Sequence, residues 1–300
     1  MKKIFFELCI LFTIFILIIS IIEWRLKHIN GQVDILLSKT NNKNKILIIG
    51  NSHTGALNAY TDSSEINNSI LNLSMANLEL QDRFKLLQYA INNNKQINTI
   101  ILGLDADQIG HNTTSTNYDR QLKRYGFELN DNSLGNNLIS HLNFFRLQLP
   151  LTNLISTLFF GYNKETFQNN FIPFTNKKFS DVEACKKRAQ EHSIYTFNKI
   201  NINSNVTILN KIIQFCNTNK VKLYFIQTPK SFCYSSAYNN NNNMQQVTKY
   251  IDSLALNNSV LFLNYLNNPI FLDTDFADFD HLNSNGTNKL LNIIFKKIIN

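Results

Sequence analysis

The stretch Lys45-Ile-Leu-Ile-Ile-Gly50-Asn-Ser-His-Thr54 decides the fold. Its apolar half does not alternate with polar residues, which is typical of a strand that is buried on both faces of a sheet. Gly50 ends the apolar run, and a serine and a histidine follow almost at once. The stretch therefore predicts a central strand whose end presents polar side chains.

Further apolar runs alternate with helical periodicity along the rest of the chain. We expect strands at 69–73, 98–103, 222–226 and 259–263, and helices at 78–92, 206–219, 244–256 and 284–299. Strands that alternate with helices are typical of a parallel sheet with helices on its faces. The sequence therefore predicts an α/β domain, a three-layer sandwich around a central parallel sheet.

Between about residues 105 and 180 this alternation is lost. The segment is rich in Asn and aromatic residues, with a helical pattern near 138–155. It is too long for a loop of a compact domain, so we expect a mostly helical cap or insertion; an extra helical layer with no catalytic part explains the pattern equally well. The Asn-rich run at 239–243 predicts a mobile loop tip.

Ser52 is the first candidate for chemistry, because it follows the first strand and precedes a helix. Parallel α/β sheets bind ligands at the carboxyl ends of their strands, and a helix N-terminus favours negative charge. Such a position suits a nucleophile whose attack generates an oxyanion. A Gly-Asn-Ser turn can also serve simply as a helix cap, so Ser52 taken alone does not decide the function.

A second group of polar residues, Asp278-Phe-Asp-His281, precedes the last helix. An Asp three residues before a His can turn back and accept the imidazole Nδ1–H. The Nε2 atom is then free to take a proton from a serine hydroxyl. Asp280 is an alternative partner for His281, although the side chain of an adjacent residue tends to point away.

Together the two motifs resemble the SGNH (GDSL-like) hydrolase family. In that family an early Gly-Asp-Ser turn carries the nucleophile, and a late Asp-x-x-His completes the triad. The resemblance covers about residues 45–299 in the order of strands and helices, and it implies an SGNH/flavodoxin-like sheet. It also implies that Ser52 is the nucleophile, His281 the base and Asp278 the acid that orients the base. The Gly-Asn-Ser-His step looks like the version found in O-acyltransferase domains of the cell envelope.

Two positions depart from the family pattern. Family members complete the oxyanion hole with a Gly after the second strand and an Asn after the third. Here the second strand is followed by Ser74-Met-Ala-Asn77, without a Gly, and the third by Gly103-Leu-Asp105. An ionised Asp cannot donate a hydrogen bond, and losing one oxyanion donor costs about a hundred- to a thousandfold in rate. Either Asn77 or another amide supplies the donor, or Asp105 is protonated, or the site is catalytically poor. His53 is a further candidate for contact with the oxyanion or substrate.

A metal site can also be assembled from His53, His281 and Asp278, which would converge at one edge of the sheet. The chain offers no H-x-x-x-H or C-x-x-C spacing, and a metal would leave the serine without a role. The motifs G-x-G-x-x-G and G-x-x-x-x-G-K are absent as well. We therefore expect no metal, no nucleotide and no other cofactor.

Near the start of the chain, Ile4–Ile22 is an apolar run with one charge, Glu7, and is about as long as a membrane-spanning helix. No small-residue cleavage pattern follows it, which favours an uncleaved anchor over a signal peptide. Lys2 and Lys3 favour a cytoplasmic N-terminus. We expect a single-pass protein of the cytoplasmic membrane with its C-terminal domain on the extracytoplasmic side. The expected organisation is an anchor at 1–28, a stalk at 29–44 and the α/β domain at 45–300.

The composition excludes several classes of protein. The 300 residues carry 29 Lys and Arg against 21 Asp and Glu, and 44% are hydrophobic, which excludes intrinsic disorder. Positive clusters such as Lys186-Lys-Arg188 are typical of a solvated helix face, so we expect no nucleic-acid partner. Cys185, Cys216 and Cys233 show no diagnostic spacing, which leaves their redox state open. Cys216, in an apolar helical pattern, is expected in the core.

Two functional hypotheses follow. The first is an anchored serine esterase or O-acyltransferase that acts on acyl groups, expected to be acetyl, of an envelope or exported polysaccharide. Its partners would be an acylated glycan or other acyl ester, the membrane, and proteins that modify envelope polysaccharides. The second is a catalytically weak or inactive SGNH-like accessory or glycan-binding protein. A third interpretation, in which the motifs are coincidental, requires Ser52 and His281 to lie far apart.

Overall fold

The computed structural model describes residues 2–26, 32–59, 69–76, 78–110, 122, 125, 127, 181–194 and 199–299. Most of the expected cap at about 105–180 therefore lies outside the described residues, and so does Asn77. The chain divides into two compact units: residues 1–35 with 118–170, and residues 36–117 with 171–300.

The first unit contains α1 (Lys2–Leu26). Its segment Lys2–Trp24 has a mean hydropathy of 2.9 and none of its residues is buried, so this helix is long and apolar enough to cross a membrane. A short helix, α2 (Gln32–Leu37), lies within the segment that the sequence predicts as a stalk.

The second unit is built on a parallel five-stranded sheet. Its strands are β1 (Ile46–Ile49), β2 (Ile70–Asn72), β3 (Thr99–Gly103), β4 (Lys222–Gln227) and β5 (Leu261–Asn264). They are hydrogen-bonded in the order β2-β1-β3-β4-β5, and every neighbouring pair is parallel. This is the flavodoxin-like order of a doubly wound sheet. The predicted fold class, with its central parallel sheet, is confirmed.

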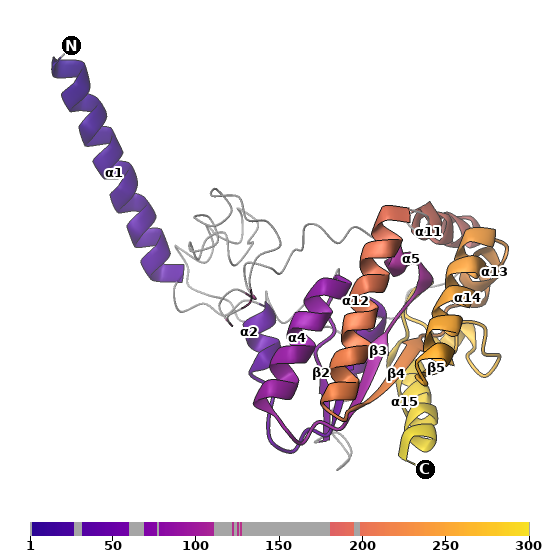
Figure 1. The fold of residues 1–300 in the computed structure, drawn as a ribbon. Helices are drawn as coiled ribbons and strands as arrows, with labels where there is room; N and C mark the ends of the chain where they lie inside the picture. Colours follow the sequence, from indigo (N-terminus) through magenta and orange to yellow (C-terminus); the bar gives the residue numbers. More distant parts are fainter. Residues whose placement is uncertain are drawn as a thin grey trace. The chain divides into compact units, whose positions relative to one another are not determined.

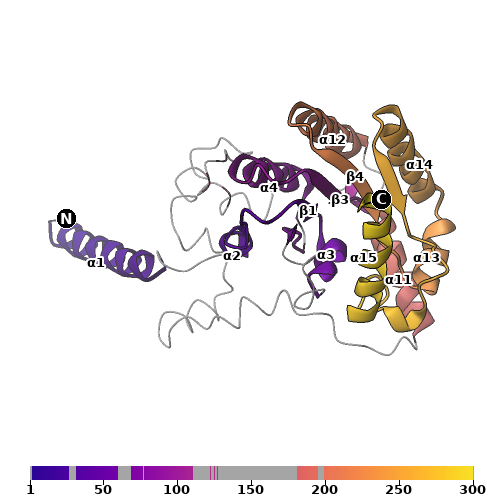
Figure 2. The same ribbon diagram turned by 90° about the horizontal axis from the view of Figure 1, so that it is seen from below.

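Helices cover both faces of this sheet (Figures 1 and 2). On one face lie α4 (Leu80–Asn93), α12 (Lys199–Thr218) and α14 (Asn242–Asn257); on the other lie α3 (Ser52–Gly55), the 3-10 helix η1 (Ala56–Ala59) and α15 (Ser284–Ile299). The Thr287 hydroxyl of α15 donates to the Ala56 carbonyl of η1 at 3.3 Å. The apolar core on the α15 face includes Ile48, Ile101, Ile226, Leu263, Leu290 and Ile294.

The Asn-rich run at 239–243 is not a loop tip, as the sequence analysis predicts, but a boundary between two helices. It ends α13 (Phe232–Asn239) and begins α14. The side-chain oxygen of Asn241 accepts hydrogen bonds from the backbone N–H groups of Asn243 and Met244, which caps α14. Helices α13 and α11 (Val182–Ile194) are among the described helices that the sequence-based prediction does not include.

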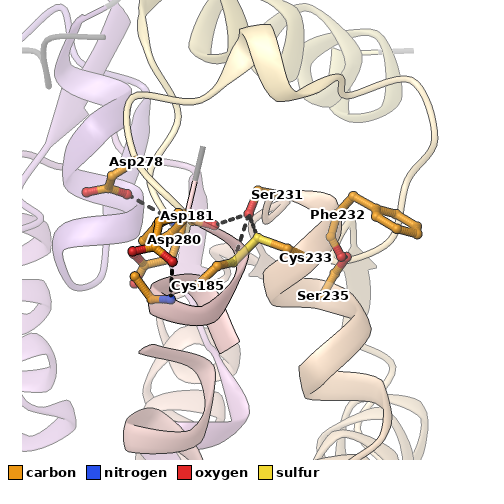
Figure 3. Close-up of a disulfide and its surroundings, with 10 residues drawn as sticks. Asp181, Cys185, Ser231, Phe232, Cys233, Ser235, Asp278 and Asp280 are labelled. Atoms are coloured by element: carbon orange, nitrogen blue, oxygen red, sulfur yellow. Dashed lines mark hydrogen bonds between the residues drawn. A yellow bond between two sulfur atoms is a disulfide. The ribbon is translucent and has the colours of Figure 1, made fainter. Parts of the chain in front are cut away.

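A disulfide between Cys185 and Cys233 joins these two additional helices (Figure 3). The spacing of 48 residues between the two cysteines carries no motif, so the pairing could not be read from the sequence. Cys216 is a buried free cysteine of α12, which confirms its expected place in the core.

Candidate active site

The turn that carries Ser52 is fitted between the ends of β1 and β3. A Cβ atom at Gly50 would overlap Thr54 Oγ1, and one at Gly103 would lie 2.5 Å from Thr54 Cγ2. The two glycines thus leave the space that buried Thr54 fills. The side-chain oxygen of Asn51 accepts the backbone N–H of His53 at 3.0 Å, which caps α3. Because α3 has only four residues, its dipole offers less stabilisation of negative charge than the sequence analysis expects.

The Asp278 carboxylate stabilises the loop before α15 through hydrogen bonds within that loop. Asp278 Oδ1 accepts the backbone N–H groups of Asp280 and His281 at 3.0 and 2.8 Å. The Lys230 ammonium, from the loop after β4, donates to the Asp280 carbonyl at 3.1 Å. These contacts fix the loop against the carboxyl edge of the sheet.

The structure brings the three predicted triad residues together in a hydrogen-bonded line, in the order Ser52, His281 and Asp278. His281 Nε2 lies 3.0 Å from Ser52 Oγ, and His281 Nδ1 lies 2.9 Å from both carboxylate oxygens of Asp278. His281 is buried, whereas Ser52 and Asp278 are partly exposed. The separation of Ser52 and His281 contradicts the interpretation in which the two motifs are coincidental.

Protonation in this line suits a general base. Burial lowers the pKa of His281 below its ordinary value, against the effect of its hydrogen bond with Asp278. Burial raises the pKa of Asp278, but the hydrogen bond from His281 outweighs this, so the pKa of that carboxyl is lowered. His281 is therefore neutral near pH 7; its Nδ1–H donates to Asp278, and its Nε2 accepts from the Ser52 hydroxyl.

The structure also brings His53 and Asp105 together. Their side chains contact each other, whereas the sequence analysis expects both at the oxyanion or substrate. His53 Nδ1 lies 2.5 Å from Asp105 Oδ2, and His53 Nε2 lies 3.1 Å from Asp280 Oδ2. Burial and the Lys230 ammonium lower the pKa of His53, but the two carboxylates raise it further, to about 9. Near neutral pH His53 is an imidazolium that donates a hydrogen bond to each carboxylate.

Asp105 is ionised in this arrangement. Burial raises its pKa, but Lys230 and His53 lower it, to about 2. Lys230 Nζ lies 3.9 Å from Asp105 Oδ2. A protonated Asp105 was one of the oxyanion donors that the sequence leaves open, and the structure does not support it because an ionised carboxylate has no proton to donate.

Two residues that the sequence analysis did not identify as site residues also lie beside Asp280. Arg188 Nη2 lies 3.4 Å from Asp280 Oδ2, and His192 Nδ1 lies 3.7 Å from the same oxygen. His192 Nδ1 also lies 2.6 Å from the Tyr234 hydroxyl oxygen, and burial lowers the pKa of His192 to about 4. Arg188, expected on a solvated helix face, reaches the site. The available signal was the four-residue spacing of Arg188 and His192, which places both on one face of α11.

A metal would have to compete with protons and other cations in this cluster. His53, Asp280 and His281 offer ligand atoms within 4.8 Å of one another. A metal-binding imidazole needs a free nitrogen lone pair, yet both nitrogens of His53 face carboxylates. Lys230 and Arg188 already place positive charge beside Asp280. The donor set therefore fits a protonated histidine better than a metal ion.

A protein-family model matches residues 177–300, less than half of the chain and a region that contains Asp278 and His281 but not Ser52. No curated protein matches the sequence significantly.

Two solved structures resemble the chain at low identity. One is a "putative acylhydrolase" from Bacteroides fragilis, with 12% identity, a TM-score of 0.42, and coverage of 86% of this chain and 88% of that one. The other is a GDSL-like lipase from Bacteroides thetaiotaomicron, with 10% identity, a TM-score of 0.43, and coverage of 85% and 88%. TM-scores this low leave the fold assignment resting on the strand order and helix placement described above.

Proposed function

We propose that this chain is a membrane-anchored serine acyl-ester hydrolase or O-acyltransferase of the SGNH type. Its substrate would be an acyl group, expected to be acetyl, on an envelope or exported polysaccharide. The observation that carries the proposal is the hydrogen-bonded line Asp278–His281–Ser52 at the carboxyl edge of the sheet. This is the arrangement of nucleophile, base and orienting acid that acyl transfer requires.

In the first half-reaction, Ser52 Oγ attacks the acyl carbonyl carbon while His281 Nε2 takes the hydroxyl proton. The carbonyl oxygen becomes an oxyanion, and Asp278 stabilises the imidazolium formed at His281. Collapse of the intermediate breaks the bond to the leaving alcohol, which receives the proton from His281. The acyl group is then an ester of Ser52.

In the second half-reaction, an incoming hydroxyl attacks this ester and gives its proton to His281. Collapse returns the proton to Ser52 and releases the product. If water supplies the hydroxyl, the product is a carboxylic acid; if a sugar supplies it, the product is a new sugar ester. Hydrolase and transferase therefore use the same residues in the same order.

Two features support a position outside the cytoplasm. Lys2 and Lys3 begin helix α1, ahead of its apolar run, and positive residues favour the cytoplasmic side of a span. The disulfide Cys185–Cys233 belongs to the α/β unit, and disulfides persist in oxidising compartments such as the periplasm and the cell surface. We therefore place the α/β unit on the extracytoplasmic side of the cytoplasmic membrane.

The ionised Asp105 favours one alternative function. It occupies the position where the family has an oxyanion-hole Asn, and its charge is engaged by His53 and Lys230. A site with fewer oxyanion donors would be slower by about a hundred- to a thousandfold. The alternative is a weakly active accessory or glycan-binding protein of an envelope assembly. Glycan binding that survives Ser52→Ala, with no ester turnover by the wild type, would support it.

A serine-directed fluorophosphonate probe tests the proposed nucleophile. The full-length chain in detergent micelles should be labelled at Ser52, and labelling should disappear in Ser52→Ala. Ser253→Ala, on the exposed face of α14, is the matched control and should be labelled like the wild type. Absence of labelling at Ser52 in the folded wild type would overturn the proposal.

A further inference from the structure

Two adjacent residues of the nucleophile turn pair with two adjacent residues of the base loop. Ser52 contacts His281, and His53 contacts Asp280 at 3.1 Å. The rings of His53 and His281 lie side by side, with centroids 4.9 Å apart. The turn and the loop are therefore joined twice, once through the proposed catalytic residues and once through a buried pair behind them.

Asp105 attaches this second pair to a third part of the sheet edge. It follows β3 and precedes the short helix α5 (Ala106–Ile109), yet its side chain makes no capping hydrogen bond to that helix. Its Oδ2 atom instead faces His53 Nδ1 and accepts a hydrogen bond from Gln108 at 3.2 Å. A buried carboxylate aimed at an imidazole fixes the ring in one orientation.

The charges around His53 balance when it carries a proton. The carboxylates of Asp105, Asp107, Asp278 and Asp280 then lie among four cations: His53, Arg83, Arg188 and Lys230. With His53 neutral, two buried carboxylates would each lose a charged donor, and unpaired buried charge is costly. The side chains of His53, Asp105 and Asp280 are at most 5% exposed, so water cannot replace that donor.

We propose that His53 is a positioning residue: a buried imidazolium that joins the Ser52 turn to the Asp278–His281 loop through Asp280, and both to β3 through Asp105. Its catalytic consequence rests on the proposed roles of Ser52 and His281. A fixed cation beside His281 disfavours the charged form of the base, so removing it should raise the pKa of His281. The titratable and charged groups that face this cluster are Arg83, Asp105, Asp107, Arg188, His192, Lys230, Tyr234, Asp278, Asp280 and His281.

Unfolding measured against pH tests the protonated bridge without any reference to catalysis. The folded-state pKa of about 9 lies above the ordinary 6.5, so the stabilisation is complete below pH 6.5 and is lost as the pH rises through 9. The stability advantage of the full-length wild type over His53→Gln should shrink over that interval. An advantage that stays constant from pH 6 to 10 would overturn the proposal.

The double variant His53→Gln/Asp105→Asn covers the case in which His53→Gln does not fold. It removes one positive and one negative charge together, so no carboxylate at β3 is left unpaired. Its stability should lack the loss that the wild type shows between pH 6.5 and 9. A double variant that loses stability over this interval just as the wild type does would count against a protonated His53.

The rate of fluorophosphonate labelling at Ser52, measured against pH, tests the effect on the base. The acidic limb should move to higher pH in His53→Gln. It should keep its position in His192→Gln, because His192 is neutral and its removal takes away no charge. If the acidic limb in His53→Gln lies at the same pH as in the wild type, the proposed effect of His53 on the base is overturned. If wild-type Ser52 is not labelled at all, the proposed function fails, while the unfolding experiment still decides the role of His53.

Discussion

His281 Nε2 lies 3.0 Å from Ser52 Oγ, although 229 positions separate the two residues in the chain. Ser52 lies three residues after the end of β1, and His281 lies three residues before the start of the last helix, α15, which packs beside the Ser52 turn. The contact is therefore a consequence of the doubly wound topology, in which polar residues at the carboxyl ends of strands meet at one edge.

Replacement of Asp278 by Asn should abolish most activity while leaving the loop intact. The Asn oxygen can still accept the backbone N–H groups of Asp280 and His281, but the amide favours the wrong tautomer of His281. By analogy with serine-protease triads, we expect kcat for an acetyl ester to fall by about a thousand- to ten-thousandfold. Asp252→Asn, on the exposed face of α14, is the control. Turnover within threefold of the control, roughly the scatter expected for an uninvolved residue, would show that Asp278 does not orient the base.

The pH dependence of kcat/KM should report a neutral base. Burial lowers the pKa of His281 below 6.5, so the acidic limb of the rate profile should be centred below pH 6.5, and the rate should fall as the pH drops through that lowered pKa. Steady-state hydrolysis of p-nitrophenyl acetate, measured from pH 4 to 8, gives the profile. An acidic limb centred above pH 6.5 would contradict the environment described for His281.

Reduction of the Cys185–Cys233 disulfide should destabilise the α/β unit. The bond closes a loop of 48 residues, for which the chain-entropy model gives a contribution of about 4 kcal/mol. Urea unfolding with and without a thiol reductant measures the loss. The double variant Cys185→Ser/Cys233→Ser should start at the lower stability and show no further response to reductant. A wild type whose stability is insensitive to reductant would argue against this pairing in the folded protein.

The regular part of the fold could be predicted because its signals are local. Strands covered on both faces are continuously apolar, so the expected strand at 98–103 differs from β3 (Thr99–Gly103) by one residue. The closing helix matches α15 at both ends. Helices α11 and α13 carry no strong apolar stripe, because the residues they bury include cysteine, alanine, tyrosine and serine. Their positions depend on a disulfide and on polar contacts, which a sequence pattern does not reveal.

The candidate site was likewise predicted only in part from the sequence. Ser52, Asp278 and His281 could be named because each stands in a short motif whose spacing has a chemical meaning. The pairing of His53 with Asp105 and Asp280 depends on how the turn after β1, the end of β3 and the loop before α15 line up, and residue spacing alone does not fix that alignment. No sequence pattern identified Lys230 as a site residue, because its partners lie on loops that are distant in sequence.

Turnover of p-nitrophenyl acetate by the full-length wild type and by Ser52→Ala tests the central claim most directly. The account predicts turnover by the wild type and its loss in Ser52→Ala, with Ser253→Ala equal to the wild type. Turnover that is unchanged in Ser52→Ala, or a folded wild type that does not turn over the ester, would contradict the claim that Ser52, His281 and Asp278 form a working catalytic triad.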